Sequence, residues 1–285
     1  MDTDAFFINN LSSVYQNPDQ TEKVAKYFLE NATSSTGKVE GHYLFSMSAA
    51  LKGNAAQSIE ELFNAKDNLT KETSPLVTTL VYSEISERYS VAGMESIGEK
   101  FERKAKIRFA EIIPGEKRII AEVILALNQS NSAANKDGIE DALQKLLQIE
   151  TNYTTMPPIL MARVSNKIAD LYLYNMKVDL AKVYFEKALS LLKTSGAESS
   201  SLSAISYHGL GNVYFEKDEL EVSKQYYKQT LAIPFIEKSI KFLAHKNISE
   251  IYKRQDSTAL LQKYYNEIFY SIHNFKTTNV LLGVH

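Results

Sequence analysis

The sequence contains no cysteine and no tryptophan, and only 11 glycines and 6 prolines occur in its 285 residues. Without cysteine the chain has no disulfide bond, no thiolate metal site and no cysteine nucleophile. The few glycines and prolines are scattered, so no flexible linker divides the chain into two halves. The formal net charge of −2 gives no general electrostatic attraction to nucleic acid or to acidic membranes.

Sequence signatures of catalysis and metal binding are also missing. No glycine-rich phosphate loop, G-x-S-x-G, H-E-x-x-H or kinase signature occurs. The five histidines are dispersed, and none has metal-ligand spacing to another histidine or to carboxylates. We therefore expect no enzyme, no catalytic residue, no metal site and no cofactor. A basic run is interleaved with glutamates, which favours a solvent-exposed helix face over a phosphate site; it comprises Arg103, Lys104, Lys106 and Arg108.

One pattern of small and large residues occurs twice between Ala162 and Glu237. The second copy reads Tyr207-x2-Leu210-Gly211-x2-Tyr214, then Ser223-x3-Tyr227-x2-Thr230. The first copy reads Ser165-x2-Ile168-Ala169-x2-Tyr172, then Ala181-x3-Phe185-x2-Ala188. The apolar positions share one helical face, and a short polar stretch separates the two halves of each copy. Each copy predicts two antiparallel helices, with Gly211 and Ala169 placed where the neighbouring helix approaches closely.

These spacings resemble the tetratricopeptide repeat, a helix–turn–helix unit that stacks with its neighbours. The small residue recurs about every 40 residues, at Ser46, Ser86, Ala169, Gly211 and Ser249, with one position skipped. The resemblance implies an all-α, right-handed α-solenoid of about six to seven antiparallel helical hairpins that occupies 1–285 as one domain. The strongest repeats are expected at 162–196, 204–237 and 242–273. Weaker hairpins are expected at 4–32, 38–69, 75–111 and 115–150. An ordinary amphipathic bundle is the alternative.

The helices of two hairpins, the one at 115–150 and the last repeat, can be placed more closely from the sequence. The hairpin at 115–150 lacks the first-helix tyrosine, and we predict helices over 116–128 and 137–149 with a polar connection at 128–134. In the last repeat, His245-x2-Ile248-Ser249-x2-Tyr252 predicts the first helix. Leu261-x3-Tyr265-x2-Ile268 predicts the second helix of that repeat.

The resemblance also implies a binding surface, because the first helices of such stacks line a concave groove. In the last three repeats the residues expected on that face are Arg163, Asn166, Lys167, His208, Asn212, Lys246 and Asn247. Asparagine amides can bind a peptide backbone in both directions, and lysine or arginine can hold a carboxylate. The expected partner is a protein or peptide segment. Replacing both Asn212 and Asn247 should abolish binding and leave the melting temperature unchanged. A wet polar surface without a ligand is the alternative.

Two other hypotheses about function are alternatives to a peptide-binding scaffold. The repeats resemble those of bacterial transcriptional regulators, so the chain is also a candidate ligand- or peptide-sensing domain of a longer regulator. No basic recognition helix occurs, and we expect no direct binding to nucleic acid. A homodimer through the terminal repeats is a further alternative, motivated by the apolar tail Val280-Leu281-Leu282.

The same sequence gives an expectation about location. The most apolar stretch, 119–127, is too short to span a membrane, so we expect no membrane span. The first residues include neither a basic segment nor an apolar one, and we expect a cytoplasmic protein. A periplasmic protein is the alternative if a signal peptide was removed.

Overall fold

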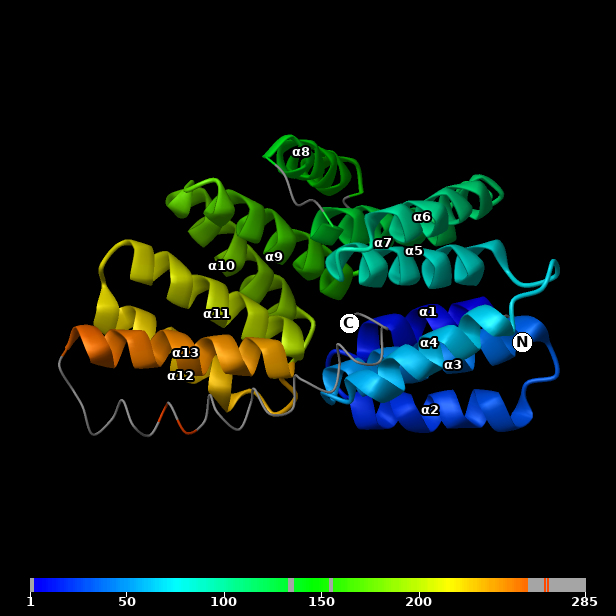
Figure 1. The fold of residues 1–285 in the computed structure, drawn as a ribbon, viewed down its shortest axis with the longest axis horizontal. Coiled ribbons are helices and arrows are strands. Elements are labelled where there is room, and N and C mark those ends of the chain that lie inside the picture. Colours follow the sequence, from blue (N-terminus) through cyan, green and yellow to red (C-terminus); the bar gives the residue numbers. More distant parts are fainter. Residues whose placement is uncertain (1–2, 133–135, 154–155, 256–263, 265, 267–285) are drawn as a thin grey trace. The chain divides into compact units, whose positions relative to one another are not determined.

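The computed structural model describes residues 3–132, 136–153, 156–255, 264 and 266. Every regular element in this part of the chain is an α-helix, and thirteen helices are defined (Figure 1). They form two compact units, the first with α1–α8 and the second with α9–α13. The predicted all-α architecture of helical repeats is confirmed. Among the described helices, none combines the length and the apolar character that crossing a bilayer requires.

The first unit consists of four consecutive helix pairs. Their bounds are α1 (Thr3–Ser13) and α2 (Pro18–Asn31), α3 (Ser35–Leu51) and α4 (Ala55–Asp67), α5 (Pro75–Val91) and α6 (Glu95–Ala110), and α7 (Glu116–Ser132) and α8 (Lys136–Asn152). Each pair alone leaves one apolar face open, so stacking on the next pair is what buries the core.

Helix α7 is longer than the sequence predicts, because it continues through residues that were interpreted as a polar connection. The amide Nδ2 of Asn128 donates to Oγ of Ser83 on α5, 3.0 Å away, and both side chains are buried. The hydroxyl of Ser130 donates to the carbonyl oxygen of Leu127 at 2.6 Å. Buried polar groups that find partners do not end a helix. The prediction that the helix ends at Asn128 is therefore wrong by one turn.

The second unit contains α9 (Pro158–Tyr174), α10 (Val178–Thr194), α11 (Ser201–Glu216), α12 (Leu220–Ala232) and α13 (Lys238–Arg254). The second helix predicted for the last repeat lies outside the described residues except at Tyr264 and Asn266, which are helical. The ring of Tyr264 packs against the rings of Tyr252 and His245, with centroids 5.5 and 5.7 Å apart. The apolar tail invoked for a homodimer also lies outside the described residues.

Four helix pairs share one internal register. A small residue on the first helix is followed seven positions later by a residue with positive φ, and twelve positions later by a small residue on the second helix. The triplets are Ser46, Gly53 and Ser58; Ser86, Gly93 and Gly98; Ala169, Met176 and Ala181; and Gly211, Asp218 and Ser223. In three pairs a serine hydroxyl donates to the opposite backbone carbonyl: Ser46 to Ser58 at 2.7 Å, Ser86 to Gly98 at 2.9 Å, and Ser223 to Gly211 at 2.8 Å.

Two glycines on α11 show why small residues are needed. A Cβ atom on Gly211 would lie 2.4 Å from the ring of Tyr227 on α12. A Cβ atom on Gly209 would lie 2.1 Å from the ring of Phe185 on α10. The prediction of a close helix approach at Gly211 is confirmed, whereas the equivalent role of Gly209 was not noticed in the sequence.

The core of the second unit runs across successive pairs. One buried cluster joins Ala169 of α9, Ala181 and Phe185 of α10, and Leu210 and Val213 of α11. Because three helices contribute to it, the pair α9–α10 is completed by the next pair. This continuity fixes the spacing of the first helices α9 and α11, and a second buried cluster joins Tyr227 of α12 to Ala244 and Ile248 of α13.

Candidate functional site

The structure brings three of the seven predicted surface residues together. His208 and Asn212 lie one turn apart on α11, and Asn247 reaches them from α13. The amide Nδ2 of Asn247 donates to Oδ1 of Asn212 at 3.0 Å and lies 3.4 Å from Nε2 of His208. The cluster therefore joins two consecutive first helices. We call these three residues the Asn212 cluster.

A tyrosine from the second helix of the pair fixes this cluster. The hydroxyl of Tyr227 on α12 donates to Oδ1 of Asn212 at 2.8 Å. With Asn247 as the other donor, both lone pairs of that oxygen are used. Burial raises the pKa of Tyr227 to about 12, so its hydroxyl stays protonated and remains a donor at neutral pH. Tyr227 was expected in the core, but its polar contact could not be found from helical spacing.

The amides of Asn212 and Asn247 retain one free group each. Within the described residues, Nδ2 of Asn212 and Oδ1 of Asn247 make no hydrogen bond, and both side chains are partly exposed. The first is a donor and the second is an acceptor. The pair thus presents both kinds of group that a peptide backbone needs, held in place by their other contacts.

His208 contributes a buried, uncharged imidazole ring to the cluster. Its ring is buried and lies 5.5 Å from the ring of Tyr227, centroid to centroid. Desolvation lowers the pKa of His208 to about 4, so the imidazole carries no charge at neutral pH. A neutral ring avoids placing a buried charge between the two helices.

Asn166 has a different role from the one the sequence suggested. It is buried, and its Nδ2 donates to the carbonyl oxygen of Leu202 at 3.1 Å. Its Oδ1 accepts a hydrogen bond from the hydroxyl of Ser206 at 2.7 Å. Leu202 and Ser206 belong to α11, so the Asn166 amide connects α9 to α11. With 3% of its surface exposed, Asn166 has little area left for a ligand.

The three predicted cations lie on the same first helices as the asparagines. Arg163 and Lys167 on α9 are partly exposed, and Lys246 on α13 is exposed. Within the described part of the chain, Arg163 and Lys246 form no hydrogen bond with the Asn212 cluster. Their role as a positively charged flank of the surface stays a prediction.

Comparisons with known proteins agree with this repeat architecture. The tetratricopeptide repeat family model matches residues 160–234, from the first turn of α9 to the end of α12. The structure is similar to BtubC (BKLC) from P. vanneervenii, with a TM-score of 0.50, 14% identity and 92% of each chain covered. It is also similar to a signal transduction ATPase with numerous domains from Pyrococcus horikoshii that has a tetratricopeptide repeat sensor. That match has a TM-score of 0.55 and 14% identity, and covers 94% of this chain and 41% of the other. No curated protein matches the sequence.

The helix pairs, their shared register and these similarities define a class. The chain is an all-α helical repeat protein, and its residues 160–234 match the tetratricopeptide repeat family. Its most recognisable repeats are the two pairs α9–α10 and α11–α12. Folds of this class commonly mediate protein interactions through extended surfaces formed by successive repeats. They are typically non-catalytic.

Proposed function

We propose that the chain is a non-catalytic scaffold that binds a protein or peptide segment along the first helices α9, α11 and α13. The observation that carries the proposal is the Asn212 cluster. An extended backbone offers one N–H and one C=O per residue, and Nδ2 of Asn212 with Oδ1 of Asn247 complement that pair. Both asparagines are held by protein contacts, which lowers the entropy lost when a ligand binds.

Positive charge on the first helices indicates that the surface prefers an acidic ligand. Arg163, Lys167 and Lys246 add positive charge to the first helices, and the exposed Lys246 directly precedes Asn247. Flexible cations at the edge of a surface change association rate and partner choice more than affinity. The proposed ligand is therefore an extended peptide with acidic side chains or a terminal carboxylate, bound mainly through its backbone.

A phage-displayed library of random peptides provides a probe that assumes no partner. Peptides selected on the wild-type protein are then titrated against Asn212→Asp, measured by fluorescence anisotropy. This variant keeps the oxygen that accepts from Tyr227 and Asn247 but replaces the free donor by an acceptor. We expect affinity to fall at least about tenfold, the equivalent of about 1.4 kcal/mol. The matched control is Gln225→Glu, the same chemical change on an exposed position of α12.

Three results bear on this proposal. Loss of binding in Asn212→Asp with retention in Gln225→Glu supports it. Equal binding by both variants contradicts the placement of the ligand at Asn212. A library that yields no peptide enriched over an unrelated helical protein contradicts peptide binding itself.

A second proposal is that the chain serves as the sensing part of a larger signalling protein, such as a bacterial transcriptional regulator. The similarity to a protein with a tetratricopeptide repeat sensor supports it, since this chain corresponds to 41% of that protein. Sequencing the gene on both sides of this segment provides the test. A reading frame that continues into a DNA-binding or ATPase domain supports a sensor role, and stop codons at both ends contradict it.

A further inference from the structure

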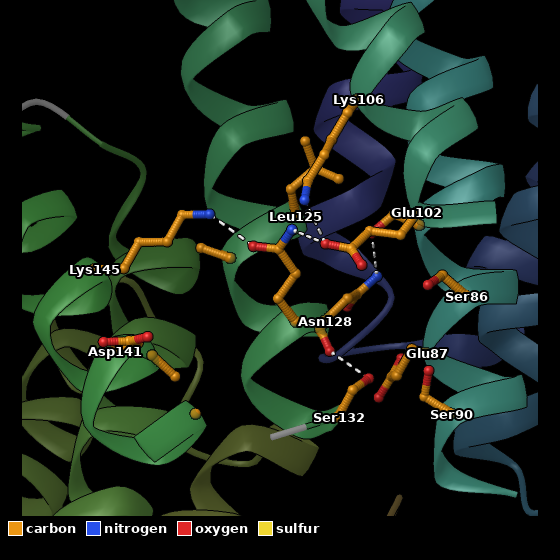
Figure 2. Close-up of a pocket in the computed structure, with 15 residues that line it drawn as sticks. Ser86, Glu87, Ser90, Glu102, Lys106, Leu125, Asn128, Ser132, Asp141 and Lys145 are labelled. Atoms are coloured by element: carbon orange, nitrogen blue, oxygen red, sulfur yellow. Dashed lines mark hydrogen bonds and ion pairs between the residues drawn. The ribbon is translucent and has the colours of Figure 1, made fainter. Parts of the chain in front are cut away.

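The first unit contains a cavity of about 350 Å³ between α5, α6, α7 and α8, with several charged side chains in its lining. In Figure 2, Lys145 and Asp141 lie on one side of the cavity, on α8, and Lys106, Glu102 and Glu87 lie on the other side, on α6 and α5. The ammonium groups of Lys145 and Lys106 both point toward the middle of the cavity. Serine hydroxyls and asparagine and glutamine amides also line the cavity. A cavity of this size is near the lower limit for small-molecule sites, which are roughly 300–1,000 Å³.

The part of the cavity near Lys106 and Lys145 has two ammonium groups but only one bonded carboxylate. The carboxylate of Glu102 accepts from Nζ of Lys106 at 2.7 Å and from Nε2 of Gln129 at 2.8 Å. The ammonium of Lys145 donates to Oε1 of Gln129 at 2.6 Å, and that oxygen is neutral (Figure 2). Lys145 therefore carries a positive charge with no carboxylate bonded to it among the described residues.

The electrostatic surroundings of Lys145 agree with this geometry. Desolvation lowers the pKa of Lys145, and the nearby charge of Lys106 lowers it further, against the opposing effects of Glu122 and Glu102. An anion bonded to Lys145 would offset both effects, because a nearby opposite charge favours the charged ammonium. The part of the cavity near Lys145 and Lys106 is thus suited to a carboxylate.

The carboxylate of Asp141 also lines the cavity, and it forms no ion pair with the nearby Lys145. Asp141 lies one turn before Lys145 on α8, an arrangement in which acid and base commonly pair. Here Lys145 turns to Gln129 instead, and Asp141 makes no hydrogen bond or ion pair within the described residues. Across the cavity, Glu87 on α5 accepts a hydrogen bond from Nδ2 of Asn131 at 2.7 Å. The two carboxylates thus lie on opposite sides of the cavity, and Asp141 suits an ammonium group of a ligand.

We propose that this cavity binds a small zwitterion, namely a free α-amino acid or a dipeptide. The ligand carboxylate binds Lys145 and Lys106, which lie on α8 and α6. The ligand ammonium binds Asp141, which lies on α8. The buried bond between Asn128 and Ser83 holds the cavity wall. The site lies within the first unit and does not depend on the peptide surface proposed for the second unit.

The test uses isothermal titration calorimetry of the full chain with the common L-amino acids and a set of dipeptides. We expect one or more of them to bind at concentrations below about 10 mM. The N-acetylated and the C-amidated forms of each binder should bind at least tenfold more weakly, because each removes one charge. Equal binding by the N-acetylated form would show a simple carboxylate site and overturn the zwitterion assignment. Absence of heat for every probe would overturn the proposal as a whole.

Two pairs of variants locate the site. Lys145→Gln and Asp141→Asn should each weaken binding at least tenfold. Their matched controls are Lys100→Gln and Glu140→Gln, which change exposed residues outside the cavity on α6 and α8 and should alter affinity less than twofold. Thermal unfolding establishes that each variant is folded before titration. Equal losses in site and control variants would contradict the assignment. A double-mutant cycle of unfolding free energies could show that Asp141 and Lys145 stabilise each other while no ligand binds. That result would also contradict the assignment.

Discussion

The hydroxyl of Ser223 donates a hydrogen bond to the carbonyl oxygen of Gly211, 2.8 Å away across the α11–α12 pair. The equivalent bond joins Ser86 to Gly98 in α5–α6, again twelve residues apart. The two pairs belong to different units, yet within each pair the same register brings the two helices into contact. Small residues at these positions thus allow the backbone of one helix to meet side chains of the other, which is the physical basis of the repeat.

Gly211→Ala should destabilise the protein despite the better helix propensity of alanine. The propensity gain is about 1 kcal/mol. Against it, the new Cβ would lie 2.4 Å from the ring of Tyr227, which is buried. Overpacking typically costs about 1–3 kcal/mol, so we expect a net loss measured by urea unfolding. Ser190→Ala on the exposed face of α10 is the control and should be neutral. A more stable Gly211→Ala would contradict the close helix approach.

Met176→Gly should stabilise the protein by about 0.5 kcal/mol. Met176 ends the turn between α9 and α10 with a φ of 57°, a conformation that costs a non-glycine residue about 1–2 kcal/mol. Part of this gain is offset because glycine makes the unfolded chain more flexible. The side chain is 66% exposed, so little packing is lost. Leu180→Gly, also partly exposed but within α10, is the control and should destabilise. The same sign for both variants would contradict the turn geometry.

His208 should make the protein less stable in mild acid. Its pKa is lowered to about 4 by burial, against about 6.5 in an unfolded chain. The unfolded state therefore binds a proton that the folded state does not, and stability falls as the pH decreases from about 6.5 to 4. By linkage this contribution reaches about 3 kcal/mol at pH 4. Urea unfolding at several pH values should show a shallower decline for His208→Gln. Parallel curves for the two proteins would contradict a buried neutral imidazole.

Asn212→Ala should destabilise the second unit, whereas Asn212→Asp should not do so to the same extent. Alanine leaves the hydroxyl of Tyr227 and the amide of Asn247 without their acceptor, which costs about 1–3 kcal/mol. Aspartate keeps an oxygen at that position. Thermal and urea unfolding of both variants provide the measurement. The sequence alone suggested that Asn212 and Asn247 could be replaced without a change in melting temperature, and their bond to each other and that of Asn212 to Tyr227 reverse that expectation.

The repeat architecture was predictable because it depends on local spacing. The small and large residues around Gly211 and Ala169 recur at fixed intervals, and interval patterns survive in a single sequence. The end of α7 was not predictable, since Asn128 and Ser130 are residue types that favour turns until their partners in space are known. Gly209 was missed because the ring it accommodates, Phe185, comes from the preceding repeat.

The candidate sites were predictable only in part. The first-helix face could be named from the resemblance, but the division of its asparagines into a packing residue, Asn166, and a partly exposed pair depends on contacts between repeats. The cavity of the first unit was missed because Glu102 and Lys106 fit the pattern of a solvated helix face. Lys145 gave no signal of its own in the sequence, since its lowered pKa comes from burial and from the charge of Lys106 on α6. Its hydrogen-bond partner, Gln129, also lies on another helix.

The most direct test of the peptide-binding proposal is NMR of the asparagine side-chain amides during titration with a selected peptide. Binding through the backbone of the peptide should shift the Nδ2 resonances of Asn212 in proportion to occupancy, while those of the buried Asn166 change little. Saturable binding that leaves the Asn212 resonances unmoved and shifts residues elsewhere would contradict the proposed surface.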